Sequence, residues 1–328
     1  MTDKEQYREL CKKELSIPIY SLDWWLDCVC ENNKWDVLLF KNNDRIEAAM
    51  IYYSPAKKII TMPAYTQTMG IWFNPEFENR NYSDNLYRKQ KICCFFIEHL
   101  PVHTFFLQYF HSSFTDWLPF YWNGYKQTTR YNYILPDIKD TDKLFKCFGG
   151  DAKRNIAKAQ KKFKLRIERK IPLDLFMEQY NMTFKQKGLK VYHPEILVKI
   201  ITTCIARNQG DIWAAVDEQN RIHTAVFIAW QNDCAYYIAA GNNPQFKKSG
   251  ANAYTLWKAI VDIKEQVKTF DFSGSMLQGV EHFIKEFGAV QLPYFVISKG
   301  KMNLFQKILL KRKSLKEYVK KNIQKTYF

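Results

Sequence analysis

Apolar and polar residues alternate over several short runs in the first half of the chain, and turn-forming residues separate these runs. Asn42, Asn43 and Asp44 lie between two of the runs, which predicts a tight β-hairpin. One longer segment instead carries apolar residues at the spacing of a helix. The strands expected are residues 35–40, 45–53, 57–62, 103–110 and 131–135, and the helix is residues 84–100.

The second half repeats this order of helices and strands in pattern, although not in identity. The helices expected are residues 171–187, 194–208, 251–266 and 279–287, and the strands are residues 211–217, 221–230, 234–240, 269–272 and 291–298. Two copies of one arrangement indicate two domains, each built on a mixed sheet of the α/β or α+β class. We place them at residues 1–140 and 141–300, followed by a basic amphipathic helix at residues 301–328.

The composition is that of a globular protein with an unusual charge. The chain has 328 residues, enough for two cores of roughly 150 residues each. Hydrophobic residues make up 47% and charged residues 25%, which excludes a largely disordered chain. Lys and Arg number 49 against 33 Asp and Glu, and the resulting net charge of +16 attracts polyanions or anionic lipid head groups. A solvated basic surface without such a partner explains the same charge.

The cysteines and histidines do not stand at the spacing of a metal site. No Cys-x-x-Cys pair occurs among the 8 cysteines, and the 6 histidines are scattered, so we expect no metal and reduced thiols. Charged residues occur throughout residues 1–16, and no apolar run reaches the roughly 18 residues of a membrane span. We expect a cytoplasmic protein that docks, at most, on the inner face of a membrane.

A turn of small residues and lysines connects a predicted strand to a predicted helix. It contains Lys248, Ser249, Gly250, Ala251 and Asn252. The unpaired N–H groups and the dipole of a helix start attract anions, and lysines strengthen that attraction. The turn is therefore a candidate site for the phosphate groups of a ligand. A plain helix start with a turn glycine is the alternative.

The short strand at residues 269–272 ends in an acidic residue followed by small ones. Asp271 is placed to accept a proton from an amine, and the hydroxyl groups of Ser273 and Ser275 are placed to donate to a developing oxyanion. The alternative is a strand-to-helix turn in which Asp271 or Ser275 caps the next helix.

Three further residues are candidates for substrate binding. Arg154 and Lys158 lie four apart on a predicted helix, and so on one face, where they would grip a diphosphate on an acceptor or form a solvated basic surface. Tyr237 lies on the strand before the phosphate-binding turn, where alternation points it to a cleft or to the core.

Residues 268–289 resemble the C-terminal motif of Fem-type acyltransferases, which are members of the GNAT superfamily. The matching positions are Asp271, Phe272, Gly274, Gly279, Phe283, Phe287 and Gly288. Residues 250–257 resemble the start of that group's cofactor-binding helix, and residues 153–159 resemble the basic helix that opens its second domain. The resemblance covers residues 150–298, and the first half matches in its order of elements alone.

The resemblance implies two tandem GNAT-like domains and transfer of an acyl group to an amine, with acyl-CoA, in the first place acetyl-CoA, as co-substrate. The implied acceptor is an amino sugar or an amino acid, small or lipid-linked, in cell-envelope or polysaccharide synthesis. In this chemistry the protein positions the two partners and stabilises the oxyanion, and no covalent intermediate is needed. The oligomeric state is not indicated by the sequence.

One departure from the Fem pattern bears on the donor. Fem-type peptidyltransferases carry a lysine directly after the first aromatic residue of the final helix, whereas this chain has Ile284 there and Lys285 next. One residue is a turn of about 100° on a helix, so Lys285 faces elsewhere. The departure favours a coenzyme A donor over aminoacyl-transfer RNA. A transfer-RNA-dependent peptidyltransferase and a non-catalytic basic module that docks on membrane or nucleic acid remain the alternatives.

Overall fold

The structure is a computed structural model that describes residues 1–78, 81–186 and 188–302. These residues form two compact units, one of Met1–Thr129 with the described residues from Tyr294 onward and one of Arg130–Pro293. Strands β6 (Lys126–Leu135) and β12 (Val290–Gly300) contribute residues to both units. The helix expected at residues 301–328 lies, apart from its first two residues, outside the described part of the chain.

The first unit contains the predicted hairpin. β1 (Trp35–Asn42) and β2 (Arg45–Ala56) pair antiparallel, and Asn43 and Asp44 turn the chain with φ angles of 48° and 64°. Asn and Asp tolerate this left-handed backbone region in hairpin turns. The strands follow the order β1-β2-β3-β5-β12, with β4 paired to β2. The bounds are Ile59–Thr61 for β3, Gly70–Phe73 for β4 and Phe105–Tyr109 for β5.

Helix α3 (Tyr82–His99) contributes buried side chains to the apolar core of the first unit. It begins at Asn81, whose side chain accepts hydrogen bonds from N–H groups of the first turn. Its buried side chains pack with those of β2, β5 and the short helix α4 (Leu118–Trp122). Burial of these apolar groups is the main stabilising contribution within the unit.

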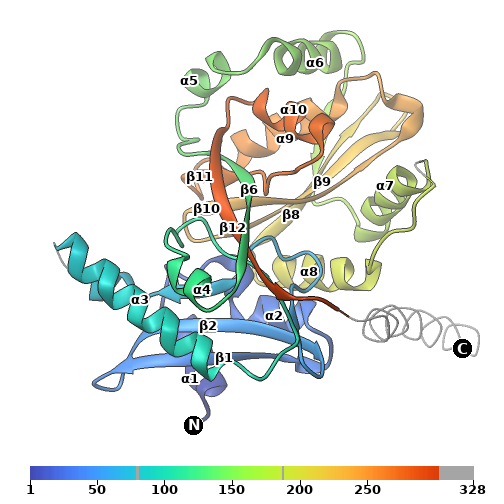
Figure 1. The fold of residues 1–328 in the computed structure, drawn as a ribbon. Helices are drawn as coiled ribbons and strands as arrows, with labels where there is room; N and C mark the ends of the chain where they lie inside the picture. Colours follow the sequence, from blue (N-terminus) through green and yellow to red (C-terminus); the bar gives the residue numbers. More distant parts are fainter. Residues whose placement is uncertain (79–80, 187, 303–328) are drawn as a thin grey trace, which may run out of the picture. The chain divides into compact units, whose positions relative to one another are not determined.

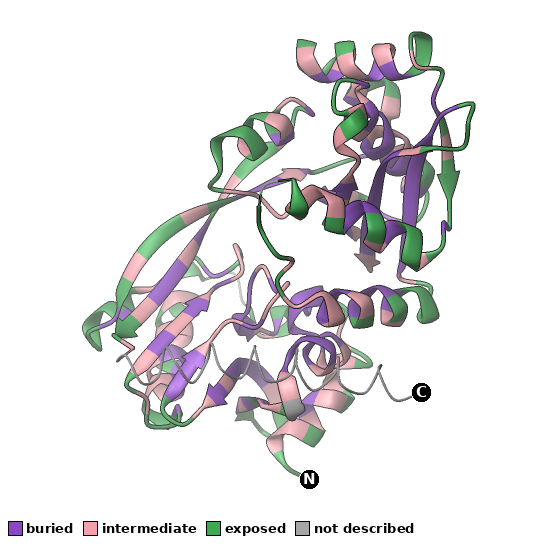
Figure 2. Ribbon diagram, turned by 90° about the vertical axis from the view of Figure 1, so that its right-hand side faces the viewer, coloured by how far each residue is buried: buried purple, intermediate pink, exposed green. Residues whose placement is uncertain are grey.

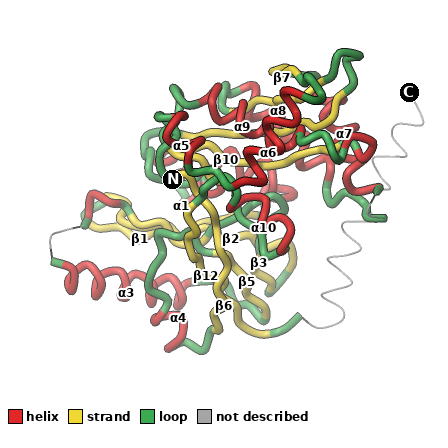
Figure 3. The backbone as a smooth tube through the Cα atoms, turned by 90° about the horizontal axis from the view of Figure 1, so that it is seen from above, coloured by secondary structure: helices red, strands yellow, loops and turns green. Residues whose placement is uncertain are grey.

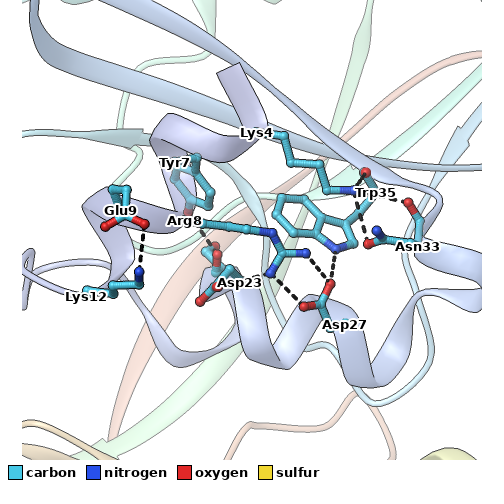
Figure 4. A network of polar contacts seen from close by, with 10 residues as sticks. Lys4, Tyr7, Arg8, Glu9, Lys12, Asp23, Asp27, Asn33 and Trp35 are labelled. Atoms are coloured by element: carbon cyan, nitrogen blue, oxygen red, sulfur yellow. Dashed lines mark hydrogen bonds and ion pairs between the residues drawn. The ribbon is translucent and has the colours of Figure 1, made fainter. Parts of the chain in front are cut away.

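A network of polar contacts joins helices α1 (Asp3–Cys11) and α2 (Asp23–Val29) to β1, as Figure 4 shows. Arg8 pairs with Asp23 and Asp27 at N–O distances of 3.1 and 2.7 Å. The indole N–H of Trp35 donates to Asp27 at 2.8 Å, and the guanidinium of Arg8 lies 5.1 Å from the centre of the same ring. These contacts hold the N-terminal helices against the first strand.

The second unit is built on the strand order β6-β11-β10-β9-β8-β7, of which Figure 1 labels all but β7. The bounds are Thr269–Asp271 for β11, Cys234–Asn242 for β10, Ile222–Gln231 for β9, Gly210–Val216 for β8 and Arg166–Arg169 for β7. Neighbouring strands in this order pair antiparallel except β10 and β11, which pair in parallel. Every residue of β8 is buried, as expected of a strand that helices cover on both faces. Figure 2 colours the buried segments of the chain purple.

Helices of the second unit pack on this sheet (Figure 3, helices red and strands yellow). α9 (Ala251–Ile263) lies on β8 and β9 and against α6 (Gly150–Lys161). α7 (Leu173–Lys185) packs on β10, and α8 (Pro194–Ala206) packs on β8. Because successive side chains of a strand point to opposite faces, helices on either face find an apolar surface.

The remaining helices of the second unit are α5 (Thr141–Lys146) and α10 (Gln278–Lys285). Among the helices in the described part of the chain, none is long and apolar enough to cross a membrane.

Two short strands are absent from the sequence prediction. β4 lies in an uncharged stretch that shows no alternation, and β7 consists of Arg166, Ile167, Glu168 and Arg169. Three of the four residues of β7 are exposed, so its pairing with β8 left no apolar pattern in the sequence. The longer predicted strands and helices agree with the structure within a few residues at their ends, except β6, which begins at Lys126 and not at the predicted residue 131.

Candidate active site

A glycine fixes the conformation of the turn before α9, which we call the donor turn (residues 247–252). Gly250 is the N-cap residue of α9 and has a φ angle of 79°, in the left-handed region. A Cβ atom at this position would lie 2.2 Å from the carbonyl oxygen of Asn155 on α6. Glycine therefore satisfies both the backbone angle and the close approach of α6.

A cavity of about 340 Å³ opens at the donor turn. Four of the five predicted phosphate-binding residues line it, namely Ser249, Gly250, Ala251 and Asn252. The fifth, Lys248, is exposed and outside the lining, and its neighbour Lys247 contributes to the wall instead. Residues of α6, α7, β9, β10 and α10 and of the segment 243–246 complete the wall, mostly with neutral side chains that form hydrogen bonds.

The first turn of α9 supplies backbone donors to this cavity. N–H groups in the first turn of a helix have no partner within the helix. The N–H of Ala251 donates to the side-chain oxygen of Ser249 at 3.3 Å, and those of Asn252 and Ala253 come next in the turn. Together with the helix dipole and Lys247, they form an environment that suits a phosphate group.

β10 and β11 separate beyond Asp271. The two strands pair in parallel from Cys234 to Tyr236 and from Thr269 to Asp271. β11 then ends, whereas β10 continues to Asn242, which lines the cavity. At about 3.3 Å per residue, the stretch of β10 from Tyr236 to Asn242 measures about 20 Å. Asp271 and the donor turn therefore mark the two ends of this stretch.

The carboxyl group of Asp271 is buried and accepts two short hydrogen bonds. Oδ2 accepts one from the side-chain amide of Asn132 and Oδ1 accepts one from the backbone N–H of Ser273, both at 2.6 Å. Burial raises the pKa of Asp271 to about 6, although both hydrogen bonds act in the opposite direction. A carboxyl with this pKa is mostly ionised at neutral pH and is able to take up a proton.

The residues after Asp271 form a tight turn. Ser273 and Gly274 have φ angles of 62° and 59°, and a Cβ atom on Gly274 would lie 2.1 Å from the carbonyl oxygen of Tyr131. Ser273 contacts Asp271 through its backbone N–H. The hydroxyl of Ser275 accepts a hydrogen bond from the N–H of Leu277, the N-cap residue of α10, at 3.1 Å. Ser275 thus has a structural contact at the start of α10.

Arg154, Lys158 and Tyr237 are the residues predicted to bind the acceptor. Arg154 is exposed and pairs with Asp151, and Lys158 is partly buried one turn further along α6. Neither of them lines the cavity, whereas Asn155 of the same helix does. Tyr237 follows Tyr236 on β10, and burial raises the pKa of its hydroxyl. Tyr237 packs against the apolar core of the second unit and does not line the cavity, and Arg154 lies at the surface.

Sequence reasoning missed several polar side chains of the site. Asn132 on β6 is buried and holds Asp271, and its position between two tyrosines of a strand gave a weak signal. Thr183 of α7, Gln186 at the C-cap of α7 and His223 of β9 line the cavity. These side chains line the cavity because α7 and β9 pack beside β10. No local sequence motif predicts this packing.

Asp151, His282 and Glu286 form a cluster whose side-chain ligand atoms lie within 4.8 Å of one another. Hydrogen bonds within the protein account for this cluster. Glu286 accepts from the N–H groups of Asp151 and Ala152 at 2.9 and 3.4 Å, and His282 contacts Asp151 at 3.2 Å. A carboxylate at a helix start is stabilised by the N–H groups there, so the cluster caps α6.

Comparisons with known proteins relate this chain to proteins of the GNAT fold. Residues 151–283 match the family model of the acetyltransferase (GNAT) domain. No curated protein matches the sequence. The solved structure of FemX has a TM-score of 0.63 at 11% identity, with 90% of this chain and 96% of that chain covered.

Two further solved structures share the fold. The C-terminal domain of a protein described as a putative lysylphosphatidylglycerol synthetase from Agrobacterium fabrum has a TM-score of 0.54 at 10% identity, with 91% of this chain and 93% of that chain covered. A tandem GNAT protein from the clavulanic acid biosynthesis pathway has a TM-score of 0.50 at 8% identity, with 89% of this chain and 92% of that chain covered.

The comparisons confirm the predicted fold of two tandem GNAT-like domains in the α/β class. They also confirm the predicted enzyme class, an acyltransferase, through the GNAT domain at residues 151–283. That domain lies within the second unit and contains the donor turn and Asp271.

Proposed function

We propose that this chain, whose second unit carries an acetyltransferase (GNAT) domain, transfers an acyl group from a coenzyme A thioester to the amine of an acceptor. The observation that carries the proposal is the cavity at the start of α9, with Gly250 in the left-handed conformation at its rim. Helix starts of this kind bind phosphate groups through backbone N–H groups.

The length of β10 beyond its pairing with β11 supports a long donor. The donor turn would hold the diphosphate, with Lys247 neutralising part of its charge. About 20 Å of β10 separates this turn from the level of Asp271. An extended acyl-bearing arm along β10 would bring its thioester to the carboxyl group, whereas a short acyl phosphate would not reach it.

The reaction that we propose needs one base and one oxyanion site. The acceptor nitrogen attacks the thioester carbonyl, the C–N bond forms, and the C–S bond breaks to release the coenzyme A thiolate. Asp271 accepts the proton that the nitrogen loses, and the thiolate takes up a proton in turn. Ser273 and Ser275 are the proposed hydroxyl donors to the oxyanion, and Tyr237 is the proposed contact to the acceptor.

The environment of α10 supports coenzyme A over aminoacyl-transfer RNA as donor. Ile284, at the position where Fem-type peptidyltransferases carry a lysine, is 1% exposed and packs in the core of the second unit. Lys285 pairs with Glu281 at 3.4 Å on the helix surface. The side chain at that position is therefore apolar and buried, and the neighbouring cation lies on the surface of the helix.

The acceptor in this proposal is an amino sugar or an amino acid, small or lipid-linked, and the setting is cell-envelope or polysaccharide synthesis. The description of the Agrobacterium fabrum domain as part of a putative lysylphosphatidylglycerol synthetase, together with the net charge of +16, supports an anionic or lipid-linked acceptor. Arg154, which is exposed, and Lys158, which is partly buried, are the proposed contacts to its phosphates. The cytoplasmic side of a membrane would supply such acceptors.

A turnover assay tests the proposal. The full chain is mixed with acetyl-CoA and a panel of amino sugars and amino acids, and acetylated product is measured by mass spectrometry together with released thiol. We expect amide formation with at least one amine and much slower release of thiol without it. Product from charged transfer RNA but not from any acyl-CoA would contradict the proposed donor.

A further inference from the structure

His223 of β9 is held in one orientation by a buried carboxylate. Its side chain is 2% exposed, and Nε2 lies 3.2 Å from Oδ2 of Asp217. Burial acts to raise the pKa of Asp217, but hydrogen bonds from the side chain and the backbone N–H of Arg221 keep that pKa below its usual value. Because an ionised carboxylate accepts a hydrogen bond, Nε2 carries the proton and Nδ1 of the neutral ring is an acceptor.

The imidazole ring is also fixed by stacking on Phe246, the residue directly before the donor turn. Its centre lies 3.8 Å from that of Phe246 with an angle of 5° between the planes. The guanidinium of Arg221 lies 5.0 Å from the ring centre of Phe246. Phe246 ends the short 3₁₀ helix Pro244–Phe246 and lines the cavity. The stack therefore holds His223 as part of the cavity wall.

Two acceptors in this wall have no hydrogen-bond partner among the described residues. They are Nδ1 of His223 and the side-chain oxygen of Asn252, both of them buried. Both residues line the cavity at the donor turn. A buried acceptor without a partner costs free energy, and a donor that reaches it recovers that cost. The two atoms thus favour a ligand that carries N–H groups.

We propose that His223 and Asn252 recognise the N–H-bearing, uncharged part of the acyl donor, through Nδ1 of the one and the side-chain oxygen of the other. This inference rests on the proposed coenzyme A donor. Ionised phosphate oxygens only accept hydrogen bonds, so they do not satisfy these atoms. The shared chemistry is an N–H donor, which coenzyme A offers from its adenine amine and from the amides of its pantetheine arm.

Calorimetric titration of the full chain with acetyl-CoA tests the inference. His223→Phe keeps a flat ring beside Phe246 and removes the acceptor, and Asn252→Leu removes the other acceptor at similar volume. We expect each to weaken acetyl-CoA binding about tenfold. His223→Asn places an amide near the position of Nδ1 and should restore most of the affinity, which a purely structural role of the ring would not allow.

Two fragments separate the sources of the N–H group. Adenosine 3′,5′-bisphosphate carries the adenine amine without the amides, and phosphopantetheine carries the amides without the adenine. The fragment whose binding His223→Phe weakens contains the recognised group. Unchanged affinity for both fragments in His223→Phe and Asn252→Leu would overturn the inference.

Gln108→Leu is the matched control. The side-chain oxygen of Gln108 is likewise buried and without a partner among the described residues, but it lies on β5 of the first unit. Its removal should leave acetyl-CoA affinity unchanged. Wild-type affinity in both cavity variants would contradict this inference alone, whereas failure of the wild-type protein to bind acetyl-CoA would contradict the proposed donor and the inference with it.

Discussion

The carboxyl group of Asp271 is both buried and hydrogen-bonded, and these two properties shift its pKa in opposite directions. It is buried at 8% exposure, and its two oxygens accept hydrogen bonds from Asn132 and Ser273. Burial favours the protonated form, while the two donors favour the ionised form. The net result is a pKa of about 6 for Asp271. At this pKa the carboxylate is able to accept a proton at neutral pH.

The pH dependence of turnover should report this carboxyl. We expect kcat/KM with acetyl-CoA to fall below about pH 6, because protonation of Asp271 removes the base. Asp271→Asn should lower the rate about 100-fold or more and abolish this acidic limb. A pH–rate profile of both proteins checks the prediction, and an unchanged acidic limb in the variant would assign it to another group.

The same pKa predicts the direction of a stability change. The folded value of about 6 lies above the ordinary value of 3.8, so the folded protein binds more protons than the unfolded chain between these pH values. Through this group, stability rises as the pH falls from 7 to 4 and is lost again as the pH rises through 6. Relative to Asp271→Asn, the wild-type protein should gain about 2–3 kcal/mol over this range in urea unfolding. A constant difference between the two proteins would refute the shift.

At the scale of elements, helix α9 depends on how its N-cap residue contacts α6. Gly250 has the left-handed conformation, and a Cβ atom on it would lie 2.2 Å from the carbonyl oxygen of Asn155. Gly279, in contrast, lies in α10, and a Cβ atom added there would have no heavy atom within 4 Å among the described residues. The two glycines are therefore a matched pair.

Gly250→Ala should destabilise the protein by at least about 2 kcal/mol, because strain in the backbone adds to the clash with α6. Gly279→Ala should be neutral or stabilising, because alanine favours a helix by up to about 1 kcal/mol over glycine. Thermal unfolding of both variants checks the contrast. Equal effects would mean that the close contact of α9 with α6 is not present.

The sequence predicted the long elements and missed the contacts between them. The alternation of apolar and polar residues was enough to predict the hairpin of β1 and β2, and small residues with lysines indicated the start of α9. The bond from Asn132 to Asp271 joins residues 139 apart in the chain, so no local pattern contains it. His223 and Asp217 likewise meet across the turn before β9, where sequence alone does not show which ring nitrogen stays unpaired.

At the scale of the whole molecule, the net charge of +16 determines which polyanions associate without specific recognition. We expect transfer RNA to bind at about 50 mM salt and to lose at least about tenfold in affinity by about 200 mM, because such binding is dominated by counterion release. Filter binding at both salt concentrations checks this. Tight binding of charged transfer RNA that persists at the higher concentration would support the aminoacyl-transfer alternative.

The central claim is that the start of α9 binds the acyl donor, and the change of melting temperature with acetyl-CoA tests it most directly. Lys247→Glu reverses a charge in the cavity wall, and Lys268→Glu makes the same change at an exposed position beyond the other end of α9. At about 100 times the Kd, acetyl-CoA should stabilise the wild-type protein and Lys268→Glu by about 2.7 kcal/mol, a shift of a few degrees. Lys247→Glu should show little or no shift at that concentration. No shift in the wild-type protein, or an equal shift in all three, would contradict the account.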